Sequence, residues 1–431
     1  MTMGDFLGIL SVTLLVFAAG AVHVVVHEVA HALAARMTGI GVPEVTMGAG
    51  KAWLRFRLFG TVVKVGGFNG GVTQLEPRSE AGLRCRLAAV TAAGPLSNLA
   101  LALVSWLLLA GASAGSLAEL VRWALVVLGV LITVVNLLPL TLQGGAVRSD
   151  GALLLSLARG GRRSARQALA AGRLSVAMRR HAAGELPGES GNRPGDEGPI
   201  DRSDPVILGV EGTRRIFTGE LDQAVALLRE AAPLPQDDHT RAMTLNNLAW
   251  ALLLSRPDGW LLEADQTSAE ALRLQPWEKT FDSTRGCVLV ELGELVEGRD
   301  LLRQCDLDEA ASRDRAFVLD HLLRAEARMG NLYGARAALL QLIADGADEH
   351  IVITSRALLR PMEVEHALSS LLGPDGRFVW PEHREGDEIS WHVAEMRSAL
   401  TAFVRESDGD PRGDQVRVAL GGLNPAGPAT S

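Results

Sequence analysis

The sequence predicts a mainly α-helical protein: a three-span transmembrane core with a short membrane-associated β-hairpin, followed by a cytosolic α-helical repeat region (an α-solenoid). Three observations predict this class. Three long uncharged apolar stretches lie in the first third of the chain, an alternating segment separates the first two, and small residues recur with a period of about 37 further on. Apolar residues make up 48% of the 431 residues, and the net charge of −8 argues against a nucleic-acid-binding protein. Three scattered cysteines are too few for a disulfide framework.

The apolar stretches predict membrane spans at about residues 6–36, 87–112 and 121–143, because about 20 apolar residues cross a hydrocarbon core of roughly 30 Å. A cleavable signal peptide is the alternative for the first stretch, but that stretch lacks a basic N-terminal region. Lysine and arginine are concentrated in residues 36–86 and after residue 147 and are absent from residues 1–5 and 111–119. The positive-inside rule therefore predicts an integral membrane protein, which we take to be of a bacterial cell membrane, with its N-terminus outside and its C-terminal region in the cytoplasm.

The loop at about residues 42–76 predicts a β-hairpin at the cytoplasmic membrane face. Its alternating segments, Lys51–Phe59 and Thr61–Val65, meet near Gly60, and a glycine cluster follows them. Unpaired backbone is costly in lipid, so this ribbon must pair with itself and the protein or offer its edge to another strand.

A candidate metal motif lies near the end of the first span, where His27 and His31 are one helical turn apart with Glu28 between them. Both imidazoles project from one helix face, so two ring nitrogens can reach one zinc ion at about 2.0–2.1 Å. Glu28 points away from the ligands, which makes it a candidate general base. A chance match is the alternative, but ionisable residues within a span are costly and usually functional.

A catalytic zinc site needs a third protein ligand and one open position. Asp150 is the candidate because it lies just past the third span, at about the depth of the histidines, and Glu44 and Glu76 are its competitors. His23 lies one turn before His27, too far along the axis for one zinc ion to touch all three histidines. We expect His23 to line a polar path or to bond to a neighbouring helix, with ligation the less favoured alternative.

Two polar interruptions complete the pattern. They are Gly94-Pro95-Leu96-Ser97-Asn98 in the second span and Asn136-Leu137-Leu138-Pro139 in the third. Asparagine amides in lipid need partners, and proline loosens a helix so that carbonyl groups can face a cavity or a substrate. The alternative is that Asn98 and Asn136 only hold the helices together.

In this order on three successive spans, the motifs resemble the site-2 protease family, the intramembrane zinc metalloproteases, over residues 6 to about 158. The resemblance implies that His27, His31 and Asp150 are zinc ligands and that Glu28 is the catalytic glutamate. It further implies that Asn98 and Asn136 help to hold the substrate strand or the transition state, and that the hairpin receives unwound substrate as an added strand.

The chain departs from the family in one spacing. The family aspartate follows the motif proline by about five residues, whereas Pro139 and Asp150 are eleven apart, with Gln143-Gly144-Gly145 between them. The first loop is also too short to hold both the hairpin and a PDZ domain.

The rest of the chain predicts a cytosolic helical region. Residues 159–183 form a basic surface helix, attractive to anionic lipid and equally consistent with a solvated helix, and residues 184–204 form a flexible linker. Gly219, Gly293 and Gly330 mark turns between helices that resemble tetratricopeptide repeats at residues 205–348, with a generic helical bundle as the alternative. Additional helices at 349–405 and a disordered tail at 406–431 complete the prediction.

The sequence therefore predicts a zinc-dependent metalloendopeptidase that cleaves a membrane protein substrate in or near a transmembrane segment. Its helical repeats would dock a cytosolic partner or the substrate. The rival prediction is a membrane-anchored tetratricopeptide-like scaffold without catalytic activity, favoured by the long Pro139 to Asp150 spacing. A soluble zinc protease is weakened by the uninterrupted apolar stretches.

Overall fold

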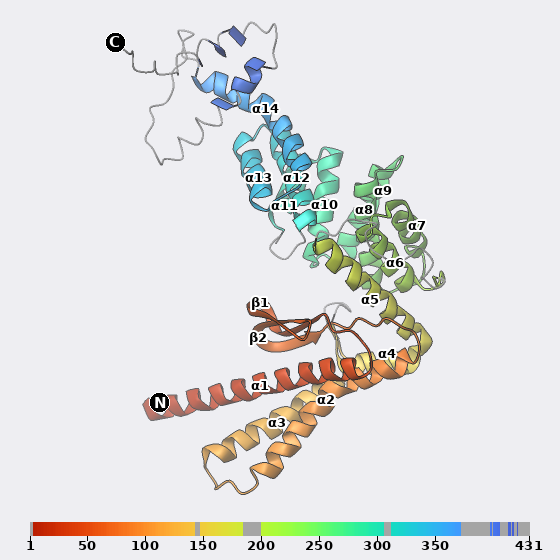
Figure 1. Cartoon of the computed structure of the whole chain (residues 1–431), viewed down its shortest axis with the longest axis vertical. Helices are drawn as coiled ribbons and strands as arrows, with labels where there is room; N and C mark the ends of the chain where they lie inside the picture. Colours follow the sequence, from red (N-terminus) through yellow and green to blue (C-terminus); the bar gives the residue numbers. More distant parts are fainter. Residues whose placement is uncertain are drawn as a thin grey trace. The chain divides into compact units, whose positions relative to one another are not determined.

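The computed structural model describes residues 3–142, 147–183, 200–305 and 312–371, with short pieces at 397–398, 400–405, 413–414, 416–417 and 420. The chain divides into two compact units, Met1–Ser255 and Arg256–Ser431. Helices predominate, and the described strands form two small sheets (Figure 1). In chain order the elements are α1 (Met3–Met37), β1 (Glu44–Leu58), β2 (Thr61–Thr73), α2 (Leu83–Leu108), α3 (Leu117–Leu137), β3 (Thr141–Leu142), β4 (Val147–Arg148), α4 (Asp150–Gly160), α5 (Arg162–Ala182), α6 (Pro205–Phe217), α7 (Leu221–Ala231), α8 (Asp238–Ser255), α9 (Trp260–Leu274), α10 (Lys279–Leu292), α11 (Leu295–Arg303), α12 (Ser312–Arg328), α13 (Leu332–Ala344) and α14 (Glu349–Leu371).

Three helices are long and apolar enough to cross a membrane: Gly8–Met37 within α1, and the whole of α2 and α3. The helix α2 packs against both α1 and α3. In the most apolar window of α1 and of α3 only 11% is buried, compared with 39% in α2. The outward faces of α1 and α3 are therefore available for lipid, while α2 supplies much of the packing between the three helices.

The third of these helices ends earlier than the sequence predicted. The expected span reached residue 143, but α3 ends at Leu137, and Leu138 adopts an extended conformation with φ −65° and ψ 137°. Proline disfavours a helical conformation in the residue before it and lacks an N–H, so Pro139 explains this end. The second helix begins at Leu83, before the expected residue 87, and takes Arg84 and Arg86 into its first turn.

The strands β1 and β2 lie within the expected bounds of residues 42–76 but are longer than the two alternating segments that predicted them. The turn lies where it was expected, at Phe59 and Gly60, whose positive φ values of 48° and 81° suit a tight hairpin turn. The glycine cluster, however, lies within β2 and does not follow it as a loop. The cluster permits close backbone packing, because a Cβ on Gly48 would lie 1.8 Å from the carbonyl oxygen of Gly67.

The two strands pair in three stretches. Residues 54–58 pair with 61–65, residues 44–47 pair with 62–65, and residues 45–47 also pair with 71–73. The stretch 71–73 therefore has β1 on one side and, among the described residues, no strand on the other. This unpaired edge lies next to α1, since β2 packs on that helix.

An apolar cluster joins the ends of α1 and α2 to α4 and α5. Its fully buried members include Ala35, Leu83 and Leu157. Arg84 adds a hydrogen bond from its Nη2 to the carbonyl oxygen of Ala158 in α4, at 3.2 Å. These contacts hold α4 beside the two membrane helices.

The basic segment forms the end of α4 and the helix α5, and several of its arginines are paired with acidic groups of the same unit. On one side Arg179 binds Glu76 at 2.5 Å, and on the other Arg163 binds Asp204, the N-cap of α6, at 2.7 Å. Further along α5, Arg166 lies 3.0 Å from Glu80. The helix therefore links the loop after β2 to the first helix of the C-terminal region.

The C-terminal region consists of short helices, several of which meet as consecutive pairs. The turn glycines Gly219, Gly293 and Gly330 have φ values of 79°, 92° and 75° and lie before α7, α11 and α13. Small residues allow close contact within pairs, because a Cβ on Gly286 of α10 would lie 3.1 Å from the carbonyl oxygen of Gly298 in α11. Helix pairs with small residues at their contacts are thus present, whereas their classification as tetratricopeptide repeats stays a prediction.

One buried ion pair stands out in the second unit. His321 of α12 is 1% exposed, and its Nε2 lies 3.2 Å from a carboxylate oxygen of Glu291 in α10. Burial lowers the pKa of His321, but Cys287, Glu291 and the Phe317 carbonyl together raise it to about 10. The hydrogen bond from His321 holds the pKa of Glu291 at about 2. Both groups are therefore charged at neutral pH.

Two predicted segments fall largely beyond the described residues. Of the linker at 184–204 only residues 200–204 are described, and of the tail at 406–431 only residues 413–414, 416–417 and 420.

Candidate metal centre

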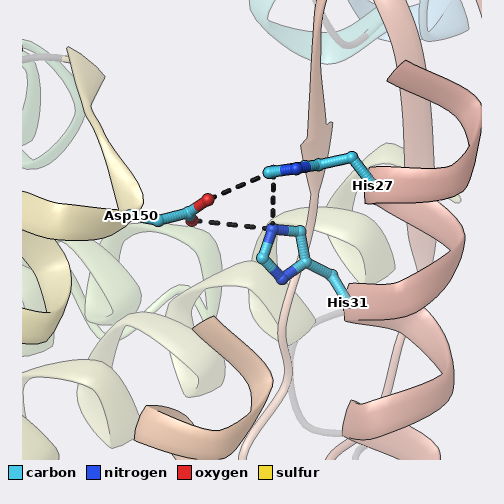
Figure 2. A group of neighbouring side chains, drawn as sticks. All are labelled: His27, His31 and Asp150. Atoms are coloured by element: carbon cyan, nitrogen blue, oxygen red, sulfur yellow. Dashed lines mark hydrogen bonds and ion pairs between the residues drawn. The ribbon is translucent and has the colours of Figure 1, made fainter. Parts of the chain in front are cut away.

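The helix α1 presents two imidazoles on one face near its C-terminal end. The Nε2 atoms of His27 and His31 lie 3.0 Å apart, and the two residues are 8% and 7% exposed (Figure 2). His31 is six residues from the end of α1, which places it about 9 Å along the axis from that end at 1.5 Å per residue. The pair therefore lies within the apolar helix but close to one end of it.

Asp150, the first residue of α4, faces both imidazoles from the opposite side (Figure 2). Its Oδ2 lies 3.1 Å from Nε2 of His27, and its Oδ1 lies 3.5 Å from Nε2 of His31. These three residues are the group in the described part of the chain that could hold a metal ion, with ligand atoms within 4.8 Å of one another.

Between Pro139 and Asp150 the chain leaves the end of α3 and returns to it. Thr141 pairs with Arg148 across the two short strands, and the backbone N–H of Ser149 donates to the carbonyl of Leu140 at 3.0 Å. The Ser149 hydroxyl also donates to the carbonyl of Leu138 and caps α4 by accepting from the N–H of Ala152. The extra residues therefore leave Asp150 next to the end of α3.

Two glycines leave room where a side chain would block the centre. A Cβ on Gly94 of α2 would lie 2.4 Å from Nε2 of His31 and 2.6 Å from Nε2 of His27. A Cβ on Gly151 would lie 2.0 Å from the carbonyl oxygen of Leu137, so only glycine lets α4 begin against the end of α3. The first glycine keeps the space between the imidazoles free, and the second allows Asp150 to approach.

The donor set fits a zinc ion. Tetrahedral ligands at 2.0–2.1 Å from zinc are about 3.3 Å apart, and the three donor separations here are 3.0, 3.1 and 3.5 Å. The Nδ1–H of His31 donates to the carbonyl of Val90 at 2.7 Å, which leaves the lone pair of Nε2 directed at the centre. Two Nε2 lone pairs and a carboxylate converge on one point, and a cation balances such a set.

The carboxyl of Asp150 is suited to be the anionic ligand. Burial raises its pKa, but the neighbouring imidazoles of His27 and His31 outweigh burial, so its pKa lies below the ordinary value. Its place in the first turn of α4 adds the favourable field of a helix N-terminus. Asp150 therefore contributes a negative charge beside the two imidazoles.

Glu28 lies beside the centre without facing the ligands. It is 4% exposed, and the hydroxyl of Thr73 in β2 donates to its Oε2 at 2.6 Å. A Cβ on Gly71 would lie 2.5 Å from its Oε1. The unpaired edge of β2 is thus packed directly against the carboxylate, and the hydrogen bond from Thr73 fixes its orientation.

The other predicted residues occupy different places. His23 is fully buried, with Nδ1 3.1 Å from the Asn98 side chain and Nε2 2.9 Å from the carbonyl of Leu125 in α3. Asn98 also reaches Nδ1 of His27 at 3.0 Å. His23 therefore bonds to neighbouring helices, as expected. Asn136 is half-buried near the end of α3 and forms no side-chain hydrogen bond with any described residue.

The two competitors of Asp150 are engaged elsewhere. Glu44 binds Lys64 at 3.0 Å in the sheet, and Glu76 binds Arg179 of α5 at 2.5 Å. The structure thus brings Asp150 to the histidines and neither glutamate.

Sequence reasoning missed Thr73 and the spatial role of Gly94. Thr73 was assigned only to the end of the hairpin loop, and no spacing rule connects it to Glu28. Gly94 was noted only as the first residue of the motif in the second span, whereas its contact distances show that it keeps space open beside the histidines.

Comparison with protein families relates part of this chain to known peptidases. Residues 15–120 match the model of peptidase family M50, the site-2 protease family. The match includes His27, Glu28, His31 and Asn98 and ends before Asp150 and the C-terminal helices. Comparisons with curated proteins and with solved structures give no match. The segment that supplies both imidazoles and the neighbouring glutamate is therefore similar to a family of membrane metallopeptidases.

Proposed function

We propose that this protein is an intramembrane zinc metalloprotease that hydrolyses a peptide bond in or near a transmembrane segment of another membrane protein. The observation that carries the proposal is the meeting of His27 and His31, on a helix apolar enough to span a membrane, with Asp150 at the start of α4, and with Glu28 next to His27 in the chain. The similarity of residues 15–120 to peptidase family M50 supports it.

In this proposal His27 and His31 ligate through Nε2, and Asp150 ligates through a carboxylate oxygen. When bound, zinc supplies Lewis-acid polarisation of a carbonyl group and lowers the pKa of a water molecule. Three protein ligands leave one position open, as a catalytic site requires. Gly94 keeps the space between the two imidazoles free of side-chain atoms.

Glu28 is the proposed general base and acid. Its Oε1 faces the side where Gly71 has no side chain, while its Oε2 is held by Thr73. Oε1 is therefore the oxygen available to take a proton from water and to return it to the leaving amine. The hydrogen bond from Thr73 to Oε2 keeps the carboxylate in place during both transfers.

We propose that the substrate binds as an extended strand along the edge at residues 71–73. This edge has no further strand among the described residues, and it lies against Glu28. A helical substrate must unwind first, because its carbonyl groups are otherwise engaged in helix hydrogen bonds. Strand addition would supply partners for the freed backbone groups and hold the scissile bond beside Glu28.

The C-terminal helices are the proposed docking region for a cytosolic partner or for the substrate. Paired helices with glycine turns form the kind of surface that helical repeats use for binding. The charge distribution favours this region and the sheet on the cytoplasmic side, with the N-terminus outside.

The rival function, a scaffold without catalysis, rested on the long spacing before Asp150. That spacing does not separate Asp150 from the histidines, because β3, β4 and Ser149 return the chain to the end of α3. The feature that favoured the scaffold therefore no longer distinguishes it.

The test compares the purified full chain with Glu28→Gln and with Glu119→Gln, a control at the opposite end of the membrane helices. Zinc content is measured by mass spectrometry, and cleavage is measured on fluorescent single-span peptides in the same vesicles. We expect about one zinc ion per chain in all three proteins and cleavage in all except Glu28→Gln. A wild-type chain without zinc would refute the proposal, and zinc without cleavage in every protein would favour the scaffold.

A further inference from the structure

A line of buried polar groups extends from the metal centre into the helix bundle. It joins Nδ1 of His27 to the amide of Asn98 at 3.0 Å, that amide to Nδ1 of His23 at 3.1 Å, and Nε2 of His23 to the carbonyl of Leu125 at 2.9 Å. His23 and Asn98 are both 0% exposed. The three side chains and the carbonyl come from α1, α2 and α3, so the line crosses all three membrane helices.

The carbonyl of Leu125 sets the direction of the hydrogen bonds. A carbonyl only accepts, so Nε2 of His23 must carry a proton. In a neutral imidazole Nδ1 is then an acceptor, which requires the NH₂ group of Asn98 to face it. The amide oxygen of Asn98 then faces His27 and accepts from its Nδ1–H. Nε2 of His27 is left unprotonated and directed at the metal centre, as ligation requires.

The structure has the amide in the opposite orientation, with Oδ1 toward His23 and Nδ2 toward His27. His23 would then face acceptors at both ring nitrogens and would have to be a buried cation, which is costly without an anionic partner. His27 would accept at Nδ1 and carry its proton on Nε2, where it would block ligation. A half-turn of the amide exchanges its oxygen and nitrogen without moving either neighbour. That half-turn satisfies every group in the line.

We propose that His23 and Asn98 are positioning residues that fix His27 in the tautomer protonated at Nδ1, so that Nε2 is presented to the metal. This inference rests on the proposed zinc centre and adds to it two residues that never touch the metal or the substrate. It replaces the expected contact of Asn98 with substrate, since the Asn98 side chain is fully buried and bonded at both ends.

The packing around His23 holds this line in place. A Cβ on Gly129 of α3 would lie 2.7 Å from Cε1 of His23 and 2.9 Å from Cβ of Ala102. The ring of His23 therefore fills the contact between α1, α2 and α3 and has little room to turn. The tautomer of His27 thus depends on the packing of α3, which supplies the Leu125 carbonyl.

The test measures zinc affinity of the detergent-purified full chain by competition with a chelator. Loss of such an outer partner typically weakens metal binding 10- to 100-fold, and we expect this for Asn98→Leu and a loss of about 10-fold for His23→Leu. Asn98→Asp should stay within about 3-fold of wild type, because its carboxylate still accepts from His27 and pairs with a charged His23. Thr133→Val is the matched control, since this buried hydroxyl donates to the carbonyl of Gly129 at 2.7 Å and also lies 3.2 Å from the carbonyl of Pro95 across the α2–α3 contact.

The outcomes separate a positioning role from simple helix packing. Wild-type affinity in Asn98→Leu would overturn the inference, and so would equal losses in Asn98→Leu and Thr133→Val. If Asn98→Leu fails to fold, Asn98→Asp decides: retained zinc supports the positioning role, and lost zinc overturns it. As a second readout, cobalt absorption should change in Asn98→Leu and not in Thr133→Val. A wild-type chain that binds no zinc would overturn both proposals, whereas normal zinc and cleavage in Asn98→Leu would overturn only this one.

Discussion

Substituting Gly94 by alanine should abolish metal binding without damaging the helix. The added Cβ would lie 2.4 Å from Nε2 of His31 and 2.6 Å from Nε2 of His27. A zinc ion ligated by these atoms lies about 2.0–2.1 Å from each of them, so the methyl group and the metal compete for the same space. We expect zinc affinity to fall about 100-fold or more, which corresponds to about 2.8 kcal/mol at 1.4 kcal/mol per tenfold.

The control for this experiment is Gly20→Ala. Gly20 also lies within a membrane helix, but a Cβ there meets nothing within 4 Å. Alanine favours helix over glycine by up to about 1 kcal/mol, which in Gly94→Ala offsets part of the cost of moving the two imidazoles away from the added Cβ. Zinc affinity is measured by chelator competition and thermal stability by circular dichroism of the metal-free proteins. Wild-type zinc affinity in Gly94→Ala, or an equal loss in Gly20→Ala, would refute the reasoning.

Thr73, Gly151 and the Glu291–His321 pair give three further tests. Thr73→Val removes the hydrogen bond to Glu28, so we expect kcat to fall about 10-fold with zinc content unchanged. Thr73→Ser keeps a hydroxyl and should retain the wild-type kcat. Full activity in Thr73→Val would contradict this role. Gly151→Ala forces α4 away from the end of α3, and we expect at least about 10-fold weaker zinc binding, measured by chelator competition; unchanged affinity would show that Asp150 does not depend on this contact. The pKa of His321 is raised and that of Glu291 is lowered, so their contribution to stability is complete between about pH 4.5 and 6.5 and is lost as pH rises toward about 10. Hydrogen exchange in α10 and α12, corrected for its intrinsic rate, should show this loss in the wild-type chain and not in His321→Gln.

The parts of the site that sequence predicts best are those carried by one regular element. The helical period alone places His27 and His31 on the same face, and their Nε2 atoms lie 3.0 Å apart. The expectation that His23 bonds to a neighbouring helix follows from the same period together with the cost of a polar group in lipid. Such inferences need no knowledge of tertiary packing.

The third ligand could only be nominated, because its position depends on a local return of the chain. Asp150 lies eleven residues after Pro139 in the sequence. A rule based on sequence spacing alone therefore predicts that the two residues lie further apart in space than they do in the family motif. The hydrogen bonds of Ser149 to the residues just after α3 bring the chain back to the end of that helix. The sequence of residues 140–149 does not predict those hydrogen bonds, because short polar and glycine-rich segments fit many turn geometries.

The contact between β2 and Glu28 could not be predicted from the sequence for a different reason. The packing of β2 against Glu28 depends on which residues of the strand are glycine and which carry a hydroxyl at the point of contact. Register in a glycine-rich strand is weakly specified by pattern, since neither face is marked by alternating apolar residues. Thr73 therefore had no signal that could separate it from its neighbours.

The placement of Asp150 ties the metal centre to the helices that follow it. Asp150 begins α4, and the next helix, α5, binds Glu76 through Arg179 and Asp204 through Arg163. Glu76 belongs to the loop after β2, whose last strand residue holds Glu28. Asp150, the proposed third ligand, and Glu28, the proposed general base, are thus connected to the same basic helix, one through the chain and one through an ion pair. Asp204 is only 2% exposed and is also the N-cap of α6, whereas the Arg163 side chain that it binds is 60% exposed. The arginines of α5 therefore join the elements of the proposed site to the first helix of the C-terminal region within one compact unit.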